Sequence, residues 1–223
     1  MKIEGSIALV TGGNRGIGRH FVQQLLVRGA AKVYAAARNP HTVDVPGAIP
    51  VALDITDPDA VAAAAAAIPD LTLLVNNAGI TTGSDLVTGD LSAIKQEIDT
   101  NFYGPLGMIR TFAPVLARNG GGAILNVNSR MSWLSYPGAN AYAASKAASW
   151  SMTNGVRMEL AAQNTQVTGL YLSSTDTDMM AGWDVPKNDP ADVVTTALDG
   201  LETGAPEVLA DQETKKTKAS LAT

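Results

Sequence analysis

Short apolar stretches alternate along the chain with longer stretches in which apolar residues recur at helical spacing. The short stretches are rich in aliphatic and β-branched residues, which is typical of buried parallel strands. We expect strands at residues 7–11, 32–37, 49–54, 71–76, 123–128, 167–172 and 207–210. We expect helices at about residues 16–29, 57–67, 91–118, 141–163 and 190–203. This alternation predicts an α/β fold with a doubly wound parallel sheet of about seven strands flanked by helices.

Local signals place several helix ends. Asp57 and Asp189 each precede a proline, which is the arrangement of an N-cap followed by the first helical residue. Glycines occur where three helices should stop, at Gly29, Gly120 and Gly204. Residues 38–50 contain three prolines and a glycine, so the helix between the second and third strands should be short or missing. No internal repeat or linker is visible, and residues 1–223 are predicted to form one domain.

Composition and charge narrow the classes of function. The 223 residues carry a net charge of −5 and no cysteine, which argues against nucleic-acid binding and removes disulfides and thiolate sites. Two histidines are too few for a histidine-rich metal site, and we expect no metal. The N-terminus lacks a signal-peptide pattern, and the longest apolar run, residues 60–68, is about half the length of a membrane span. We therefore expect a cytoplasmic protein with no membrane partner.

A glycine-rich turn follows the first strand directly and precedes a helical pattern. Residues 11–18 read Thr-Gly-Gly-Asn-Arg-Gly-Ile-Gly. Glycines let the backbone approach a pyrophosphate closely, and the N-terminus of the following helix offers free N–H donors. A tight strand-to-helix turn needs similar residues, but the position after the first strand favours a dinucleotide site.

The glycine spacing, Thr-Gly-x-x-x-Gly-x-Gly, resembles that of the short-chain dehydrogenase/reductase family, which implies a Rossmann-like fold. Within this family, the chain resembles the short-chain NADPH-dependent carbonyl reductases. Motifs that this family places elsewhere are also present: Asp54, Asn76-Asn77-Ala78-Gly79, Asn101, Ser129, Tyr142 and Lys146. Tyr142 follows Ser129 by 13 residues, and Lys146 follows Tyr142 by four. The resemblance implies a cofactor site that includes Gly12, Asn14, Arg15, Gly16, Ile17, Gly18, Arg38, Asp54, Ile55, Asn76, Ala78, Gly79, Tyr142, Lys146 and Thr177.

Reduction of a carbonyl places a hydride on carbon and a proton on oxygen. The resemblance implies that Tyr142 supplies the proton and that Ser129 donates a hydrogen bond to the substrate oxygen. Lys146 lies on the same face of a helix as Tyr142, and we expect its charge to lower the tyrosine pKa from about 10. The resemblance also implies that Lys146 bonds the nicotinamide ribose and that Asn101 holds a water for proton resupply. Alone, such a tyrosine or lysine is usually a surface residue; the joint spacing favours catalysis.

The end of the second strand indicates which cofactor is preferred. Relatives that prefer NAD have an acidic residue there, which takes the ribose 2′-hydroxyl. Here the position is Ala37 and Arg38 follows, while Arg15 in the glycine turn points to the same region in the family. Guanidinium groups bind phosphate well, so we expect a preference for NADPH.

Two departures from the family pattern border the substrate. Leu172-Ser173 replaces the usual Pro-Gly, although Thr177 remains in register to hold the nicotinamide carboxamide. Hydroxyls there, including Ser174, would bind a polar substrate or satisfy a turn. Only ten residues separate Met179 from Pro190, so a large closing lid is not expected. Candidate pocket walls, equally typical of core or interface residues, are Met131, Trp133, Tyr136, Met179 and Trp183.

The leading interpretation is an oxidoreductase that transfers a hydride between NADPH and a small-molecule carbonyl or secondary alcohol substrate, in the direction of ketone or aldehyde reduction. An epimerase or dehydratase of the same superfamily, and an NADPH-binding redox sensor without turnover, are the alternatives. A homodimer through the helices near residues 91–118 and 141–163 is expected. A tetramer is less secure, because the last strand leads into a charged tail rather than Val-Asp-Gly-Gly.

Overall fold

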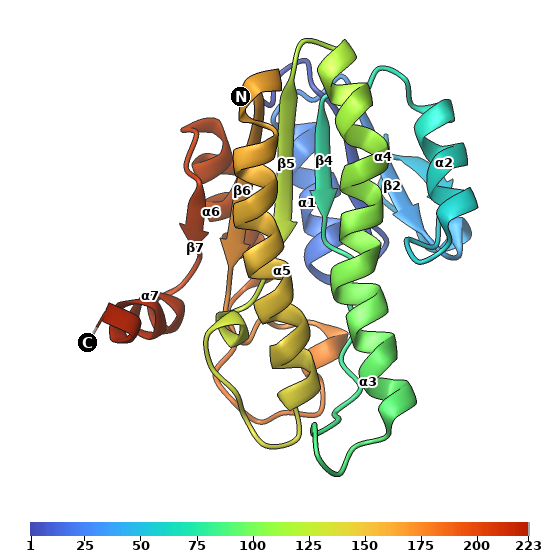
Figure 1. Cartoon of the computed structure of the whole chain (residues 1–223). Coiled ribbons are helices and arrows are strands. Elements are labelled where there is room, and N and C mark those ends of the chain that lie inside the picture. Colours follow the sequence, from blue (N-terminus) through green and yellow to red (C-terminus); the bar gives the residue numbers. More distant parts are fainter. Residues whose placement is uncertain (223) are drawn as a thin grey trace.

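The computed structural model describes residues 1–222, and a seven-stranded parallel sheet forms its centre (Figure 1). The strands lie in the order β3-β2-β1-β4-β5-β6-β7, so the direction of winding reverses between β1 and β4. Their bounds are β1 Ile7–Thr11, β2 Lys32–Ala37, β3 Ile49–Ala52, β4 Leu73–Asn76, β5 Gly122–Val127, β6 Thr165–Tyr171 and β7 Glu207–Leu209. Ligands of doubly wound sheets bind at the carboxyl ends of the strands beside such a reversal.

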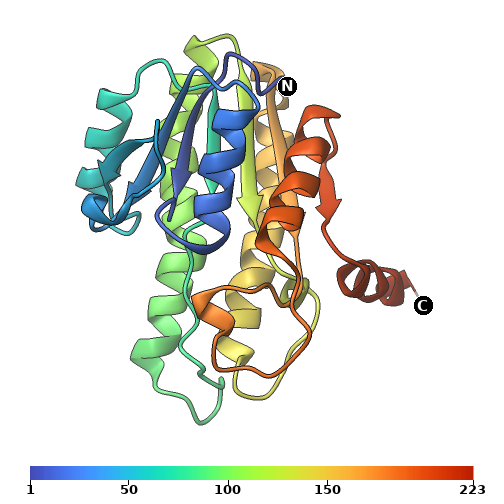
Figure 2. The same ribbon diagram turned by 180° about the vertical axis from the view of Figure 1, so that it is seen from behind.

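Helices cover both faces of the sheet. Their bounds are α1 Gly16–Val27, α2 Pro58–Ala67, α3 Leu91–Ile98, α4 Gly104–Arg118, α5 Asn140–Glu159, α6 Pro190–Glu202 and α7 Gln212–Ala219. Helices α2, α4 and α5 lie on the face toward the viewer in Figure 1, and Figure 2 shows α1 and α6 on the other face. The parallel sheet is therefore buried on both sides, as its continuous apolar strands require.

The first strand shows how the sequence divides the core into two layers. Ala8 and Val10 belong to the apolar cluster that includes α1 and α6, whereas Leu9 belongs to the cluster that includes α2, α4 and α5. All three side chains are fully buried. The alternation follows from the two-residue period of a strand, which turns successive side chains to opposite faces.

The structure confirms the predicted fold class and the seven predicted strands, whose ends differ from the predicted ends by up to two residues. The Asp57 and Asp189 carboxylates accept backbone hydrogen bonds from the first turns of α2 and α6, as expected of N-caps. Between β2 and β3 the chain forms only a single 3₁₀ turn, Pro40–Thr42. The prolines of this segment thus prevent a longer helix, as predicted.

Two helical predictions were wrong. Residues 91–118 do not form one regular helix, because a π-helical turn at Asp99–Tyr103 separates α3 from α4. Beyond β7 the charged tail forms helix α7, which was absent from the predicted helices and is capped by the Asp211 side chain. Both differences arise from contacts with residues far away in the sequence, described below.

Within residues 1–222, no helix has both the length and the apolar character needed to cross a lipid bilayer.

Candidate active site

One large cleft of about 2220 Å³ lies at the carboxyl ends of the central strands. Its walls come from the loops after β1, β2, β3, β4, β5 and β6. At the lower end of the molecule in Figure 1, α3, the start of α5 and the segment before α6 extend beyond the sheet. The cleft therefore runs from the predicted dinucleotide site to the predicted catalytic residues.

The glycine turn between β1 and α1 forms one wall of the cleft. Gly12 and Gly16 have positive φ angles of 63° and 50°, which side-chain-bearing residues rarely adopt. A Cβ at Gly18 would lie 2.0 Å from the Gly12 carbonyl oxygen, so only glycine permits this close turn. Arg15, at the N-cap of α1, makes no capping bond through its side chain. The turn thus leaves backbone N–H groups of α1 for an anion.

Thr11 joins this turn to the neighbouring strand. Its hydroxyl accepts hydrogen bonds from the backbone N–H groups of Asn77 at 2.9 Å and Ala78 at 3.0 Å. In return, the Asn77 amide donates to the Thr11 carbonyl at 2.9 Å. These bonds hold the predicted Asn-Asn-Ala-Gly segment against the glycine turn. Sequence reasoning used Thr11 only as part of a motif and assigned it no contact.

The arginine side chains that were predicted to bind the adenosine part of the cofactor border the cleft. Ala37 and Arg38 border it, and Arg15 forms an exposed ion pair at 3.3 Å with Asp178 on the opposite loop. In the loop after β3, hydrogen bonds from the backbone and hydroxyl of Thr56, with a smaller effect of the Arg38 charge, hold the pKa of Asp54 below its usual value. No acidic side chain occupies the position of Ala37.

Ser129, Tyr142 and Lys146 meet at the other end of the cleft, and all three line it. Ser129 lies in the loop after β5, while Tyr142 and Lys146 are one turn apart on α5. The Lys146 ammonium donates to the Val127 carbonyl at 2.9 Å and lies 5.6 Å from the centre of the Tyr142 ring. Burial lowers the pKa of Lys146 to about 8.

The acidity of Tyr142 differs from the sequence-based expectation. Burial raises the pKa of Tyr142 to about 12, while hydrogen bonding with Ser129 opposes this rise and the charge of Glu97 adds to it. We expected Lys146 to lower this pKa. In the cleft formed by the chain alone, the removal of water from the phenolate is the larger effect.

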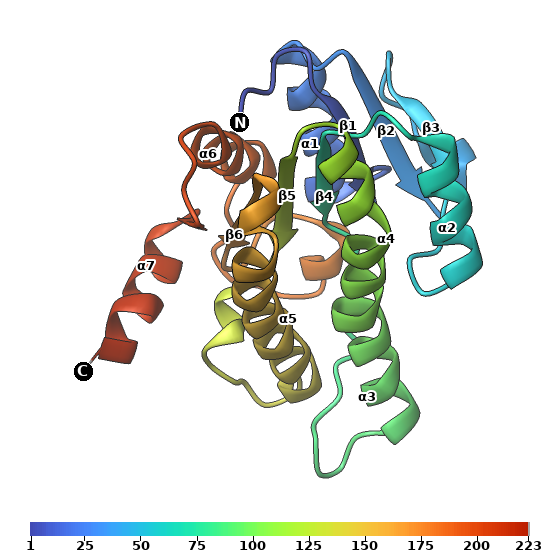
Figure 3. The same ribbon diagram turned by 45° about the horizontal axis from the view of Figure 1, so that its top comes forward.

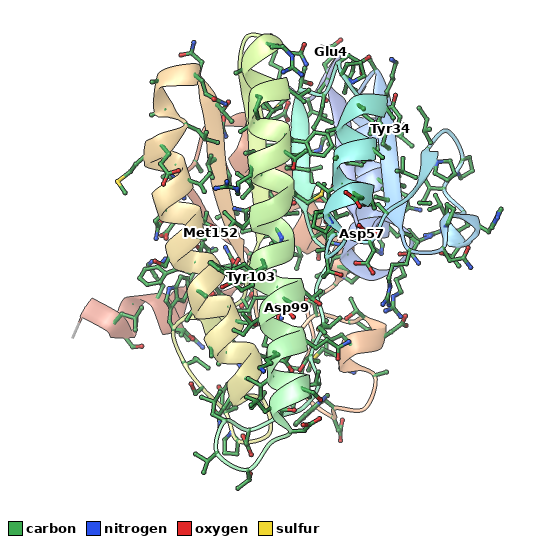
Figure 4. All side chains as sticks on the ribbon, turned by 45° about the vertical axis from the view of Figure 1, so that its right-hand side comes forward. Glu4, Tyr34, Asp57, Asp99, Tyr103 and Met152 are labelled. Carbon is green, nitrogen blue, oxygen red and sulfur yellow. The ribbon has the colours of Figure 1, made fainter. Side chains whose placement is uncertain are left out.

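Asn101 lies in the π-helical turn behind the cleft rather than in its lining. Its side-chain amide donates to the Ile80 carbonyl and to the Ser145 hydroxyl, both at 2.9 Å. Its Oδ1 accepts from the Ile80 N–H at 2.9 Å. Figure 4 labels Asp99 and Tyr103, which bound this turn between the two helices. The wider π turn is the point at which Asn101 connects α3, α5 and the loop after β4.

Glu97 is a buried acid that sequence reasoning missed. It is fully buried on α3, and its Oε1 accepts hydrogen bonds from the backbone N–H and the hydroxyl of Thr82. The loop after β4 is therefore held at two points, at Ile80 by Asn101 of the π-helical turn and at Thr82 by Glu97 of α3. Glu97 precedes Asn101 by four residues, which predicts that the two lie on the same helical face, but only the fold shows that this face is buried.

Most predicted ligand-binding residues border the cleft. Among the predicted cofactor residues, all but Gly18 and Asn76 do so; Gly18 packs on the turn itself, and Asn76 donates to Asn126 within the sheet. At the substrate end, the cleft is lined by Met131, Tyr136, Ser174, Met179 and Trp183. Trp133 is the exception. Its ring lies outside the cleft lining and stacks on Tyr171, with ring centres 4.6 Å apart.

Thr177 lies across the cleft from the glycine turn. A Cβ at Gly16 would be 3.2 Å from the Thr177 methyl group, which shows how closely the two walls approach. The hydroxyls in this loop bond mainly within it: Thr175 donates to the Ser173 carbonyl at 3.1 Å, and Thr177 to the Thr175 carbonyl at 3.3 Å. Two of these hydroxyls thus satisfy a turn, while Ser174 lines the cleft.

Comparison with known proteins agrees with this arrangement. The family model described as short chain dehydrogenase matches residues 6–187. Carbonyl reductase [NADPH] 2 from Sus scrofa is 33% identical over 179 residues, covering 76% of this chain and 72% of the relative. The 3-oxoacyl-[acyl-carrier-protein] reductase of Vibrio harveyi is 30% identical over 188 residues, covering 80% of this chain and 77% of the relative. A crystal structure of a short chain dehydrogenase from Burkholderia cenocepacia in complex with NADP superposes with a TM-score of 0.94, at 39% identity, over 100% of this chain and 95% of the other.

Proposed function

We propose that this chain, which belongs to the short chain dehydrogenase family, is an NADPH-dependent oxidoreductase that reduces a ketone or aldehyde to an alcohol. The observation that carries the proposal is the convergence of Ser129, Tyr142 and Lys146 at one end of the cleft that begins at the glycine turn. Similarity to proteins that use or bind NADP supports the choice of cofactor.

The residues present fit a dinucleotide. The positive φ angles of Gly12 and Gly16, and the absence of a Cβ where Thr177 approaches Gly16, leave the cleft open beside the N-terminus of α1. In the proposed complex, α1 N–H groups hold the pyrophosphate, and Arg15 and Arg38 hold the 2′-phosphate. For Arg15 this requires that its exposed pair with Asp178 exchange for the phosphate.

The chemistry divides between the cofactor and the chain. When bound, NADPH supplies the hydride that the carbonyl carbon accepts. Tyr142 gives its phenolic proton to the carbonyl oxygen, and Ser129 donates a hydrogen bond to that oxygen as negative charge develops on it. Lys146, buried beside Tyr142, binds the cofactor ribose and stabilises the phenolate left after proton transfer. Asn101 keeps α3, α5 and the loop after β4 in register behind these groups.

The mouth of the cleft supports a substrate with a bulky apolar group. Large apolar side chains that stay exposed are unfavourable when they gather on one surface, unless a ligand covers them. Tyr136, Met179, Trp183 and Val185 are all exposed, and all four line the same cleft. We therefore propose that aryl or long-chain alkyl ketones are better substrates than sugars or keto acids.

The test is the decay of NADPH absorbance with a carbonyl panel that pairs aryl ketones with aldoses and 2-keto acids. We expect turnover with the aryl ketones, and a loss of at least about 100-fold in kcat for Tyr142→Phe with an unchanged Kd for NADPH. Tyr34→Phe, on β2 and outside the cleft lining, is the control and should retain wild-type rates. Tight NADPH binding without turnover of any carbonyl would instead indicate a redox sensor.

A further inference from the structure

Helix α7 is too polar to be held by an apolar face of its own. Its sequence, Gln-Glu-Thr-Lys-Lys-Thr-Lys-Ala, contains one apolar residue, and an isolated helix of this length is unstable in water. In Figure 3 it extends away from the edge of the sheet beyond β7. Specific contacts at its two ends must therefore hold it.

At its start, one carboxylate joins the helix to the cleft. Oδ1 of Asp211 accepts from the Thr214 N–H at 2.8 Å, which caps α7. Oδ2 accepts from the Thr214 hydroxyl at 2.9 Å and from the Ser173 backbone N–H at 2.8 Å. Partial burial acts to raise the pKa of Asp211, but these hydrogen bonds outweigh it and hold the pKa below its usual value. Both oxygens thus act only as acceptors.

The Ser173 contact reaches the nicotinamide end of the cleft. Two further hydrogen bonds continue from Ser173 through the loop. The Thr175 hydroxyl donates to the Ser173 carbonyl, and the Thr177 hydroxyl donates to the Thr175 carbonyl. No proline fixes φ anywhere between residues 172 and 177. Hydrogen bonds must therefore restrain this loop. The Asn188 amide donates to the Ser173 hydroxyl at 3.0 Å and to the Ser174 carbonyl at 2.9 Å, while Asp211 holds the Ser173 backbone N–H.

Near the C-terminal end of α7, Lys218 contacts the elements that carry the predicted catalytic residues. Its ammonium lies 4.4 Å from the ring centre of Trp133, 5.6 Å from that of Trp150 and 6.0 Å from that of Tyr171. It also pairs with Glu207 at 3.1 Å. Trp133 follows Ser129 in the loop after β5, Trp150 lies on α5, and Tyr171 immediately precedes the Leu172–Thr177 loop. Helix α7 is held by the same elements that form the catalytic end of the cleft.

We propose that Asp211 is a positioning residue for hydride transfer, whose carboxylate holds the Ser173 backbone and so places Thr177 against the nicotinamide. The inference rests on the proposed function, because it assigns the loop to a bound nicotinamide. It extends that function to a residue outside the cleft lining.

Asp211→Asn separates the two tasks of the carboxylate. Asparagine is as good an N-cap as aspartate, so its one oxygen can keep the Thr214 N–H. The carboxamide has one acceptor oxygen for two backbone donors. When that oxygen keeps the Thr214 N–H, the NH₂ group can donate to the Thr214 hydroxyl, but it faces the Ser173 N–H as a second donor, and the bond to the loop is lost. We expect kcat/KM for NADPH to fall by about tenfold or more, because a hydrogen bond to a charged acceptor is lost.

Thr214→Val is the matched control. It removes the hydroxyl donor from the other side of the same carboxylate and leaves the Ser173 contact in place. We expect it to lower the thermal unfolding midpoint at least as much as Asp211→Asn does, with NADPH kinetics within about twofold of the wild type. Wild-type kinetics for Asp211→Asn, or an equal kinetic loss in both variants, would overturn the proposal.

A direct NADPH titration, followed by cofactor fluorescence, keeps this test independent of turnover. If the wild type turns over no carbonyl, the proposed function fails, and the two variants are compared by their Kd for NADPH. Weaker binding by Asp211→Asn alone supports the positioning role, and equal binding by all three proteins rejects it.

Discussion

Replacing Lys218 with methionine tests whether its contacts with Trp133, Trp150 and Tyr171 hold α7. The substitution keeps an unbranched side chain of similar length and removes the charge. In the native protein that charge lies 4.4 Å from the nearest ring centre and 3.1 Å from the Glu207 carboxylate. Only 30% of the Lys218 side chain is exposed, so solvent screens these interactions incompletely.

The size of the effect follows from these contacts. A partly desolvated cation over an aromatic face contributes about 1 kcal/mol, and a half-buried ion pair adds up to about 1 kcal/mol. We therefore expect Lys218→Met to lower the free energy of unfolding by about 1–2 kcal/mol. For a chain of this size, the loss corresponds to a fall of about 2–8 °C in Tm.

The assay is urea unfolding followed by tryptophan fluorescence, with Tm from calorimetry. Lys216→Met is the control, because Lys216 lies on the same helix, is 71% exposed and pairs only with Glu213 among the contacts described. Lys216→Met should leave the free energy of unfolding near that of the wild type. Lys218→Arg, which keeps the positive charge, should retain most of the stability that Lys218→Met loses. If Lys216→Met and Lys218→Met destabilise the protein equally, the aromatic contacts do not hold α7.

Three further predictions concern the cleft. Because burial lowers the pKa of Lys146 to about 8, its charge is lost as pH rises through that value. The affinity for NADPH, measured by fluorescence, should therefore fall between about pH 7 and pH 9. Lys146→Met should remove this pH dependence. Arg38→Asp should raise KM for NADPH at least about tenfold and that for NADH much less, whereas Arg118→Asp, outside the cleft lining, should alter neither. Trp183→Ala should lower kcat/KM for aryl ketones by about tenfold and leave small polar aldehydes unaffected, and equal losses for both would contradict an apolar mouth.

The strands and the doubly wound fold class could be predicted because local patterns indicate them. Runs of buried aliphatic residues, such as the one around Leu9, require cover on both faces, and aspartates and glycines mark the ends of the intervening helices. The π turn at Asn101 could not be predicted in this way. Its Asn101 forms a pair of hydrogen bonds with Ile80, 21 residues away, and residue periodicity contains no information on such contacts.

Helix α7 and the position of Trp133 were missed for the same kind of reason. The periodicity used to find helices depends on an apolar face, and α7 has none. Its stability depends on Asp211 and Lys218, whose partners lie on β6, β7, α5 and the loop after β5. Trp133 was a candidate wall of the substrate pocket, equally typical of a core or interface residue, and its ring packs beside Lys218. Proximity in sequence does not determine the side of a loop to which a side chain turns.

The acidities of Tyr142 and Lys146 show a further limit of reasoning from spacing. Spacing placed both groups on one face of α5, but their pKa values depend on how completely packing excludes water from that face. With a pKa of about 12, Tyr142 keeps its proton at neutral pH. Reduction requires this protonated form, because the alkoxide formed on the substrate is a stronger base than a phenolate and takes the proton. Oxidation of an alcohol requires the phenolate, which burial disfavours. In the chain alone, the surroundings of Tyr142 therefore keep it in the protonated form that donates to a carbonyl oxygen.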